Sequence, residues 1–249
     1  MLSDYLLLGA IGFVAQLIDG ALGMAFGVIS TSAMLTMGVP VAQASAMVHT
    51  AEVFTTAASA ASHIAHGNVD WKLVARLGIG GVIGAVLGAW VLSNVDASAA
   101  RPFVAFYLLL LGIFILLKAA RQIPRRDAPF AWAPPLGLVG GFLDASGGGG
   151  WGPMVASTLI GSGHAPRRAV GSVNTTEFFV TVAAATTFFI ELGVAPWSEL
   201  IALVIGGVIA APLGGWAVKR LPPRVLMTMV GVLVVTLSAW QLARALKLL

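Results

Sequence analysis

Four acidic residues lie inside long apolar stretches of the sequence, where charged side chains are rare: Asp19, Glu52, Asp144 and Glu177. The first and third of them, like the second and fourth, are 125 residues apart, so they form two pairs. A carboxylate at membrane depth costs at least about 2.5 kcal/mol and therefore usually faces a cavity and a partner. This pattern predicts ion-coupling residues. The structural alternative is a set of protonated acids that only bond to neighbouring helices.

Each of the two glutamates has polar neighbours on a predicted helix. Residues three positions apart share one helix face, which places His49 beside Glu52. The same spacing places Asn174 beside Glu177 in the second pair. We therefore predict a substrate-binding surface formed by four side chains: His49, Thr50, Asn174 and Thr175.

A run of glycines interrupts the apolar segment at residues 146–153, which read Ser-Gly-Gly-Gly-Gly-Trp-Gly-Pro. A glycine inside a helix costs roughly 1 kcal/mol relative to alanine, so four in a row argue against a continuous helix. Unwound glycines expose backbone N–H groups, and a half-helix that begins after them presents the positive end of its dipole. The predicted anion-binding residues are Ser146, Gly147, Gly148, Gly149 and Gly150, with a weaker copy at residues 20–27. The alternative is that these glycines only let helices approach closely.

The composition defines the environment of these residues. Of 249 residues, 58% are hydrophobic and only 10% are charged, and the mean hydropathy is +0.94. An ordinary soluble protein is excluded, because it needs charged residues to cover its surface. About 20 apolar residues cross the hydrocarbon core of a bilayer. Six segments are long enough: Ala44–Ala65, Leu73–Leu92, Phe103–Ala120, Ala169–Ile190, Glu199–Val218 and Val225–Ala245.

The remaining composition excludes other classes of protein. The net charge of +4 does not indicate binding to nucleic acid, because the basic residues lie between the apolar spans. The absence of cysteine excludes disulfides and thiolate metal sites. The N-terminal segment has no Lys or Arg, so we expect no cleavable signal peptide.

The chain is predicted to be an internal duplication. The shift of 125 residues also aligns Gly12 with Gly137, and after one inserted residue Trp90 aligns with Trp216. We expect a first transmembrane repeat at residues 1–120, a cytoplasmic basic linker at 121–132 and a second transmembrane repeat at 133–249. The expected fold is an all-α polytopic membrane protein. In each repeat a glycine-broken opening segment, Gly9–Gly38 or Pro134–Gly163, is followed by three transmembrane helices.

The basic residues indicate how the two halves are oriented. If each opening segment returns to the side from which it came, all but three of the 14 Lys and Arg residues share one face. The three on the other face are Arg101, Arg244 and Lys247. The positive-inside rule assigns the richer face to the cytoplasm, with both termini outside it. The second half is then inverted relative to the first, an architecture that is known from secondary transporters.

The sequence resembles the TauE/SafE sulfite exporter family, which are small bacterial membrane proteins with two related halves. The resemblance covers nearly the whole chain and rests on two features of each half. These are the glycine-rich opening segment and the following small-residue helix with a Thr-centred polar motif. The run at 147–153 matches the glycine-then-proline signature of the family. The first half departs from it, with Val28 in place of the proline. The resemblance implies transport of sulfite, sulfoacetate or related sulfonates across the bacterial inner membrane.

The residues and the resemblance together predict a secondary transporter for a small sulfur-containing oxyanion, which works by alternating access. Like charges about 4 Å apart repel by about 4 kcal/mol at an effective dielectric constant of about 20. An anion can therefore share a cavity with Glu52 and Glu177 only if these are protonated or balanced by a cation. This predicts coupling to protons or, as the second choice, Na⁺.

A divalent-cation transporter is the main alternative, because carboxyl and imidazole groups also bind such ions. We expect neither an enzyme nor a cofactor. The expected partners are the lipid bilayer, the substrate anion and the coupling ion, and an oligomer is left open.

Overall fold

The computed structural model describes residues 2–22, 25–120, 132–162, 164–193, 197–218 and 223–246. Within these ranges the chain consists of helices and short connections, which confirms the all-α class. In chain order the elements are α1 (Leu2–Leu22), α2 (Phe26–Thr36), α3 (Val41–Ala65), α4 (Trp71–Asn94), α5 (Ala97–Ala120), α6 (Ala133–Gly147), the π-helical turn η1 (Gly152–Ala156), α7 (Ser157–Gly161), α8 (Pro166–Leu192), α9 (Trp197–Val218) and α10 (Pro223–Ala245). The predicted linker at 121–132 lies outside the described residues except for Trp132.

Local sequence explains where several helices begin and end. Asp70 caps α4, because its Oδ1 accepts hydrogen bonds from the backbone N–H groups of Lys72 (3.0 Å) and Leu73 (3.2 Å). Both α6 and α8 have proline in the first turn, where its missing N–H costs nothing. Gly148 ends α6 in the left-handed conformation, at φ 72° and ψ 34°.

Four of the helices are long and apolar enough to cross a membrane over their described residues: Trp71–Asn94, Ala97–Ala120, Arg168–Leu192 and Met227–Ala245. Shorter apolar helices occur at Tyr5–Asp19, Phe26–Thr36 and Leu200–Ala211. Each of the six predicted spans overlaps one long helix. These helices are α3, α4, α5, α8, α9 and α10. The 25-residue α3 is not among the four, because it carries many buried polar side chains.

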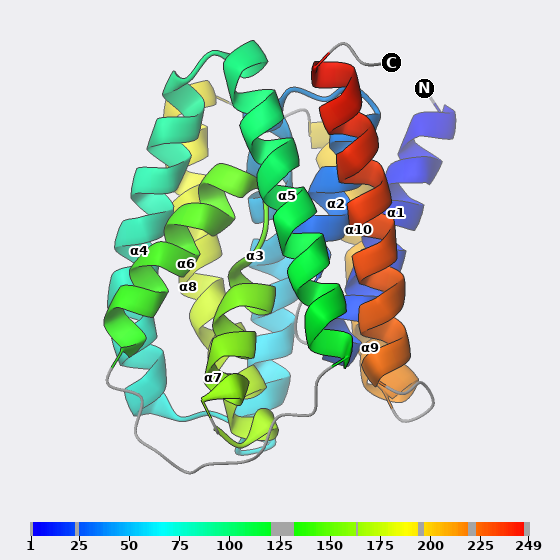
Figure 1. Ribbon diagram of the computed structural model, residues 1–249. Helices are drawn as coiled ribbons and strands as arrows, with labels where there is room; N and C mark the ends of the chain where they lie inside the picture. Colours follow the sequence, from blue (N-terminus) through cyan, green and yellow to red (C-terminus); the bar gives the residue numbers. More distant parts are fainter. Residues whose placement is uncertain are drawn as a thin grey trace.

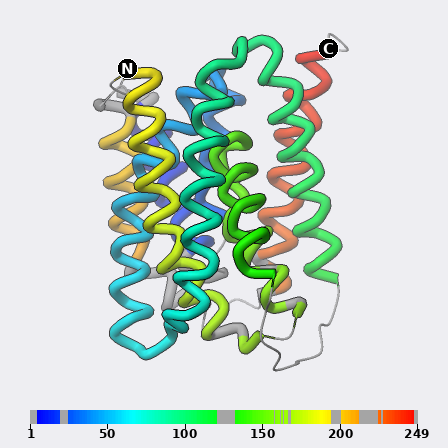
Figure 2. Tube along the Cα trace, turned by 90° about the vertical axis from the view of Figure 1, so that its left-hand side faces the viewer, coloured from blue at the N-terminus to red at the C-terminus, as the bar shows by residue number. Residues whose placement is uncertain are grey.

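The helices run roughly along one common axis, and both termini lie at the same end of the bundle (Figures 1 and 2). α3 runs away from that end, whereas α8 runs back toward it. Each predicted opening segment forms a pair of arms: α1 and α2 in the first half, and α6 and the continuous η1–α7 run in the second. The chain leaves each pair at the end of the bundle where it entered (Figure 1).

The opening helix of each half packs against a helix of the other half, α1 against α9 and α4 against α6. Glycines allow backbone contact at both interfaces. A Cβ added at Gly80 or Gly84 would collide with backbone atoms of α6, and one added at Gly206 would collide with the carbonyl group of Gly9 in α1. The two halves are therefore interlocked through small residues, as is usual between membrane helices.

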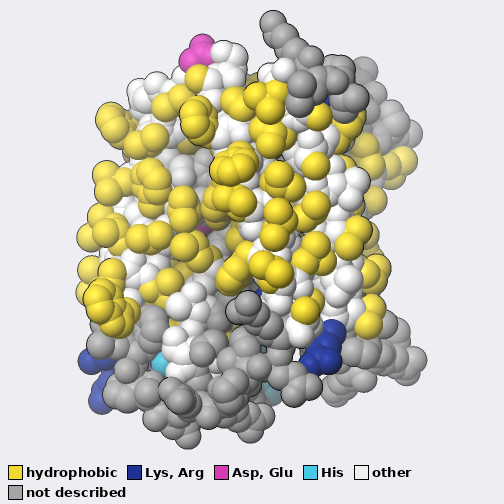
Figure 3. Space-filling view, viewed as in Figure 1, with side chains coloured by type: hydrophobic (Ala, Val, Ile, Leu, Met, Phe, Trp, Pro, Cys, Tyr) yellow, Lys and Arg dark blue, Asp and Glu magenta, His cyan; other side chains and the backbone are white. Residues whose placement is uncertain are grey.

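On the face that Figure 3 shows, the surface is apolar over its middle, and charged side chains lie near its ends. Large side chains such as Ile79, Phe103 and Ile190 are 69–74% exposed. Lys72 and Arg76 lie at the start of α4, at the end of the bundle opposite the termini. An apolar band between charged ends is what a membrane-spanning protein presents to lipid.

Candidate functional site

The interrupted segments of the two halves meet inside the bundle. A Cβ placed on Gly149 would lie 2.8 Å from Cα of Gly27 and 2.5 Å from the backbone nitrogen of Val28. Gly27 is the second residue of α2, and Gly149 lies between α6 and η1. The predicted anion-binding run and its weaker copy are therefore in direct backbone contact.

Each interruption is bridged by the aspartate that precedes it. Oδ1 of Asp144 accepts a hydrogen bond from the backbone N–H of Trp151 at 2.8 Å. Oδ1 of Asp19 accepts the corresponding bond from Phe26 at 3.3 Å. Both bonds span seven residues, so the duplication preserves a helix cap. The two aspartates were predicted as ion-coupling residues, and that role stays a prediction. In the structure each accepts a hydrogen bond from the backbone on the far side of its own break.

The second break is held by side chains from other helices. Residues 148, 149 and 150 have φ of 72°, 132° and 146°, which favour glycine. The hydroxyl of Thr31 donates to the carbonyl oxygen of Gly148, and the hydroxyl of Tyr107 donates to that of Gly149 at 3.2 Å. The Gly149 N–H donates to the backbone oxygen of Asp144 at 2.9 Å. The backbone of the second break is thus fixed in a non-helical conformation by side chains of the first half and by Asp144.

The four predicted acidic residues lie near one another inside the bundle. Glu52 is 3% exposed and Glu177 is 8% exposed. The charges that act on Glu177 are those of the three other carboxyl groups. Oε1 of Glu52 lies 3.0 Å from where a Cβ of Gly27 would be, and its Oε2 is buried with no hydrogen-bond partner. An ionised carboxylate without a partner is very unfavourable in such surroundings.

His49 connects the acidic cluster to the second half. Its imidazole is fully buried, and Nε2 lies 3.2 Å from Oδ2 of Asp144. Nδ1 lies 2.8 Å from the backbone oxygen of Ser45. The face shared by His49 and Glu52 therefore points inward, as the spacing predicted.

The other predicted polar residues have different partners. Nδ2 of Asn174 donates to the hydroxyl of Ser59 on α3 at 3.0 Å, and its Oδ1 is buried without a partner. The hydroxyls of Thr50 and Thr175 each donate at 2.7 Å to the carbonyl oxygen four residues earlier in their own helix. Their oxygen lone pairs, rather than their hydrogens, remain for other groups.

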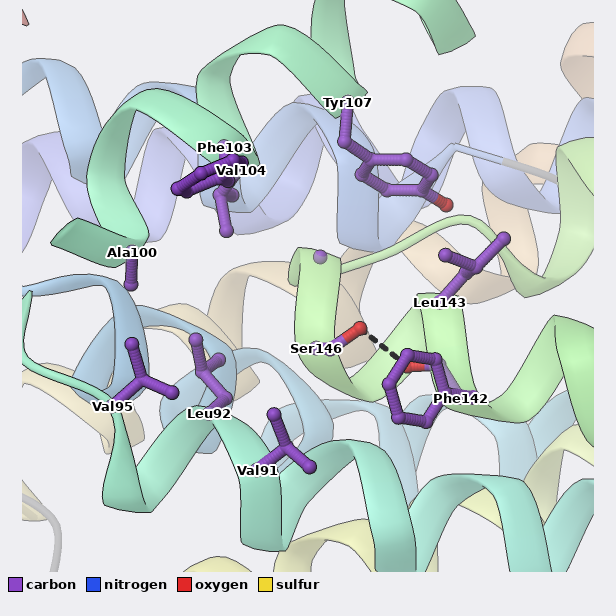
Figure 4. A pocket seen from close by; sticks show the side chains of 11 residues that line it. Val91, Leu92, Val95, Ala100, Phe103, Val104, Tyr107, Phe142, Leu143 and Ser146 are labelled. Atoms are coloured by element: carbon purple, nitrogen blue, oxygen red, sulfur yellow. Dashed lines mark hydrogen bonds between the residues drawn. The ribbon is translucent and has the colours of Figure 1, made fainter.

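A cavity of about 410 Å³ adjoins the second break (Figure 4). It is formed between α4, α5 and α6, and its wall is almost entirely apolar. Ser146 and Tyr107 project toward it from α6 and α5 (Figure 4). The hydroxyl of Ser146 donates to the carbonyl oxygen of Phe142 at 2.6 Å. Ser146 therefore faces this cavity beside the glycine run.

Several residues of the site were not predicted from the sequence. They are Thr31, Ser45, Tyr107 and Trp151. One signal was available, because an aspartate stands seven residues before an aromatic residue in both halves. Tyr107 is also one of only two tyrosines in the chain. The contact of Ser45 with Ala145, in contrast, joins residues 100 positions apart and leaves no local pattern.

The acidic cluster does not have the geometry of a metal centre in this conformation. Among the described residues, no group of three or more His, Asp or Glu side chains is arranged to hold a metal ion. His49 and Asp144 contact one another directly, at a distance that suits a shared hydrogen.

Comparisons with known proteins identify the family of the chain. The model of the family described as "Sulfite exporter TauE/SafE" matches residues 8–240. The chain is also 44% identical over 238 residues to the "Probable membrane transporter protein YtnM" of Bacillus subtilis (strain 168), which covers 92% of this chain and 79% of that protein. No solved structure matches the chain significantly. The chain therefore belongs to the TauE/SafE family of membrane transporters.

Proposed function

We propose that this protein is a secondary transporter that moves a small sulfur-containing oxyanion, such as sulfite or a sulfonate, across the bacterial inner membrane together with protons. The family description, which names sulfite, supports the substrate class. The observation that carries the coupling is the convergence of four carboxyl groups in the interior, where the two glycine breaks touch. An anion can enter such a site only when most of these carboxyl groups are neutral.

We propose further that the two halves are inverted repeats. The opposite directions of α3 and α8 and the reciprocal packing of α1 on α9 and of α4 on α6 support this arrangement. Described basic residues such as Lys72 and Lys118 lie at the end opposite the termini, so that end is the cytoplasmic one by the positive-inside rule. The site then lies between the halves, where alternating access can expose it to either side.

The substrate anion is bound by the second break and its surroundings, residues 146–150, with His49, Thr50, Asn174 and Thr175 as further contacts. Two of the backbone N–H groups there, those of Gly149 and Trp151, already bond to Asp144. The anion therefore competes with the Asp144 carboxylate for the Trp151 N–H, and with the backbone oxygen of Asp144 for the Gly149 N–H. Protonation of the carboxyl group weakens its hydrogen bond with the Trp151 N–H and favours the anion.

The proposal is tested with purified protein in liposomes that contain radiolabelled sulfite. We expect an imposed pH gradient to drive its accumulation, and Glu52→Gln combined with Glu177→Gln to reduce the response to pH by about tenfold. An unchanged pH dependence in this double variant would disprove coupling through the glutamates. If divalent metal ions stabilise the purified protein against heat and sulfite and sulfonates do not, the alternative of a metal-ion transporter holds instead.

A further inference from the structure

The contact between His49 and Asp144 joins the two halves of the molecule. His49 belongs to α3 in the first half, and Asp144 belongs to α6 in the second. Both side chains are buried, with 0% and 2% exposed area. Because α3 and α6 have few other contacts, this 3.2 Å contact is a main polar link between them.

The hydrogen bonds around His49 determine where its hydrogens are. Nδ1 lies 2.8 Å from the Ser45 carbonyl oxygen, which can only accept, so Nδ1 must carry a hydrogen. The hydroxyl of Ser45 cannot supply one instead, because it donates to the carbonyl oxygen of Ala145 at 2.7 Å.

With Nδ1 protonated, a neutral ring has only a lone pair on Nε2, and that lone pair would face an oxygen of Asp144. The contact is then favourable only if a further proton lies between Nε2 and Oδ2. Oδ1 of Asp144 is already occupied by the N–H of Trp151, so the proton belongs on the Oδ2 side. A neutral imidazole and an ionised carboxylate together hold one proton fewer than this geometry requires.

The second half has no equivalent of this pair. The position that corresponds to His49 is Asn174, which cannot take up a proton and bonds to α3 instead. The titratable groups around the pair and its neighbours come from four helices: Glu52 on α3, Asp19 on α1, Glu177 on α8 and Tyr107 on α5. The Phe188 ring also packs against His49, at 5.9 Å between ring centroids.

We infer that the His49–Asp144 pair is a proton-binding site between the halves, which holds one proton in this conformation and releases it to water when α3 and α6 separate. Loss of that proton places a lone pair against a carboxylate and weakens the link, so the proton and the closed contact stabilise one another. The inference rests on the proposed function, because it identifies which of the converging groups carries a coupled proton.

The first test is nuclear magnetic resonance of the whole protein with isotope-labelled histidine, in which His49→Asn identifies the His49 signals. Above about pH 7.5, an ordinary imidazole with a pKa of about 6.5 is neutral. The exposed His66 is the internal reference. Above this pH we expect Nδ1 of His49 to carry a hydrogen, with a second proton shared between Nε2 and Asp144. A neutral ring with its only hydrogen on Nε2 overturns the inference.

The second test compares two histidine variants in sulfite-loaded liposomes. The quantity measured is accumulation driven by a pH gradient, divided by exchange without a gradient for the same variant. We expect His49→Asn, which copies the second half, to reduce this ratio by about tenfold and the control His66→Asn to leave it unchanged. If the wild type accumulates sulfite and His49→Asn keeps its ratio, this inference fails and the proposed function stands. If the wild type shows no gradient-driven accumulation, the proposed coupling itself fails.

Discussion

The two breaks share one backbone design but differ in what surrounds them. Each has an aspartate that caps the residue seven positions later. At equivalent positions Ala25 has φ 138° and Gly150 has φ 146°, so the chain turns in the same way. However, a Cβ at Gly150 would collide with the hydroxyl of Tyr107, whereas Ala25 accommodates its own Cβ.

This difference shows what requires the glycine run of the second half. At position 150 the backbone turn alone does not require glycine, because Ala25 adopts nearly the same φ in the first half. The requirement comes from neighbours, since Thr31 and Tyr107 of the first half press against residues 147–150. The glycine run is therefore needed because side chains of the first half pack directly against the second break and leave no room for a Cβ.

The largest effect is expected where the two breaks touch. In Gly149→Ala the new Cβ would lie 2.4–2.8 Å from the backbone of residues 27 and 28, which cannot move aside as a flexible side chain could. We expect a loss of at least about 3 kcal/mol in the free energy of unfolding, measured by thermal unfolding in detergent. Gly38→Ala is the matched control, because Gly38 also has positive φ (89°) but has open space around it. Equal losses in both variants would show that backbone strain, not contact between the breaks, is what matters.

An intermediate effect is expected for the two caps. Asp144→Ala removes a 2.8 Å cap and also leaves His49 without its partner, so it should cost about 2–4 kcal/mol. Asp19→Ala removes only the longer 3.3 Å cap and should cost about 1 kcal/mol. Thermal unfolding of both variants gives the order directly. A larger loss for Asp19→Ala would contradict the unequal roles inferred for the two breaks.

The smallest effect is a gain in stability. Ala25 is the one described non-glycine residue with positive φ, so Ala25→Gly relieves strain and should stabilise the protein by about 0.5–1 kcal/mol. The reverse change at an open position, Gly67→Ala at φ 64°, should destabilise by a similar amount. A lower melting temperature for Ala25→Gly would mean that its Cβ makes contacts that outweigh the strain.

The sequence predicted the elements better than it predicted their contacts. The duplicated spacing identified the four acidic residues that converge inside the bundle, because a buried charge stands out against apolar sequence. The glycine run identified the second break for a similar reason. The link between His49 and Asp144 was not predicted, since it depends on how helices 95 residues apart pack. The two threonines show the same limit, because a hydroxyl can bond within its own helix without any sign in the sequence. The roles proposed for these side chains in transport remain predictions.

The glycine contacts between the halves also constrain how the protein is made. The opening helix α1 has its backbone-to-backbone partner in α9, which leaves the ribosome only after most of the chain has been synthesised. Until then the small-residue face of α1 can be covered only by lipid or by the insertion machinery. Whereas domains commonly fold one after another during translation, the main interface of the first helix in this protein is completed only near the end of synthesis. Truncation before α9 should therefore leave α1 without a stable position in the bilayer.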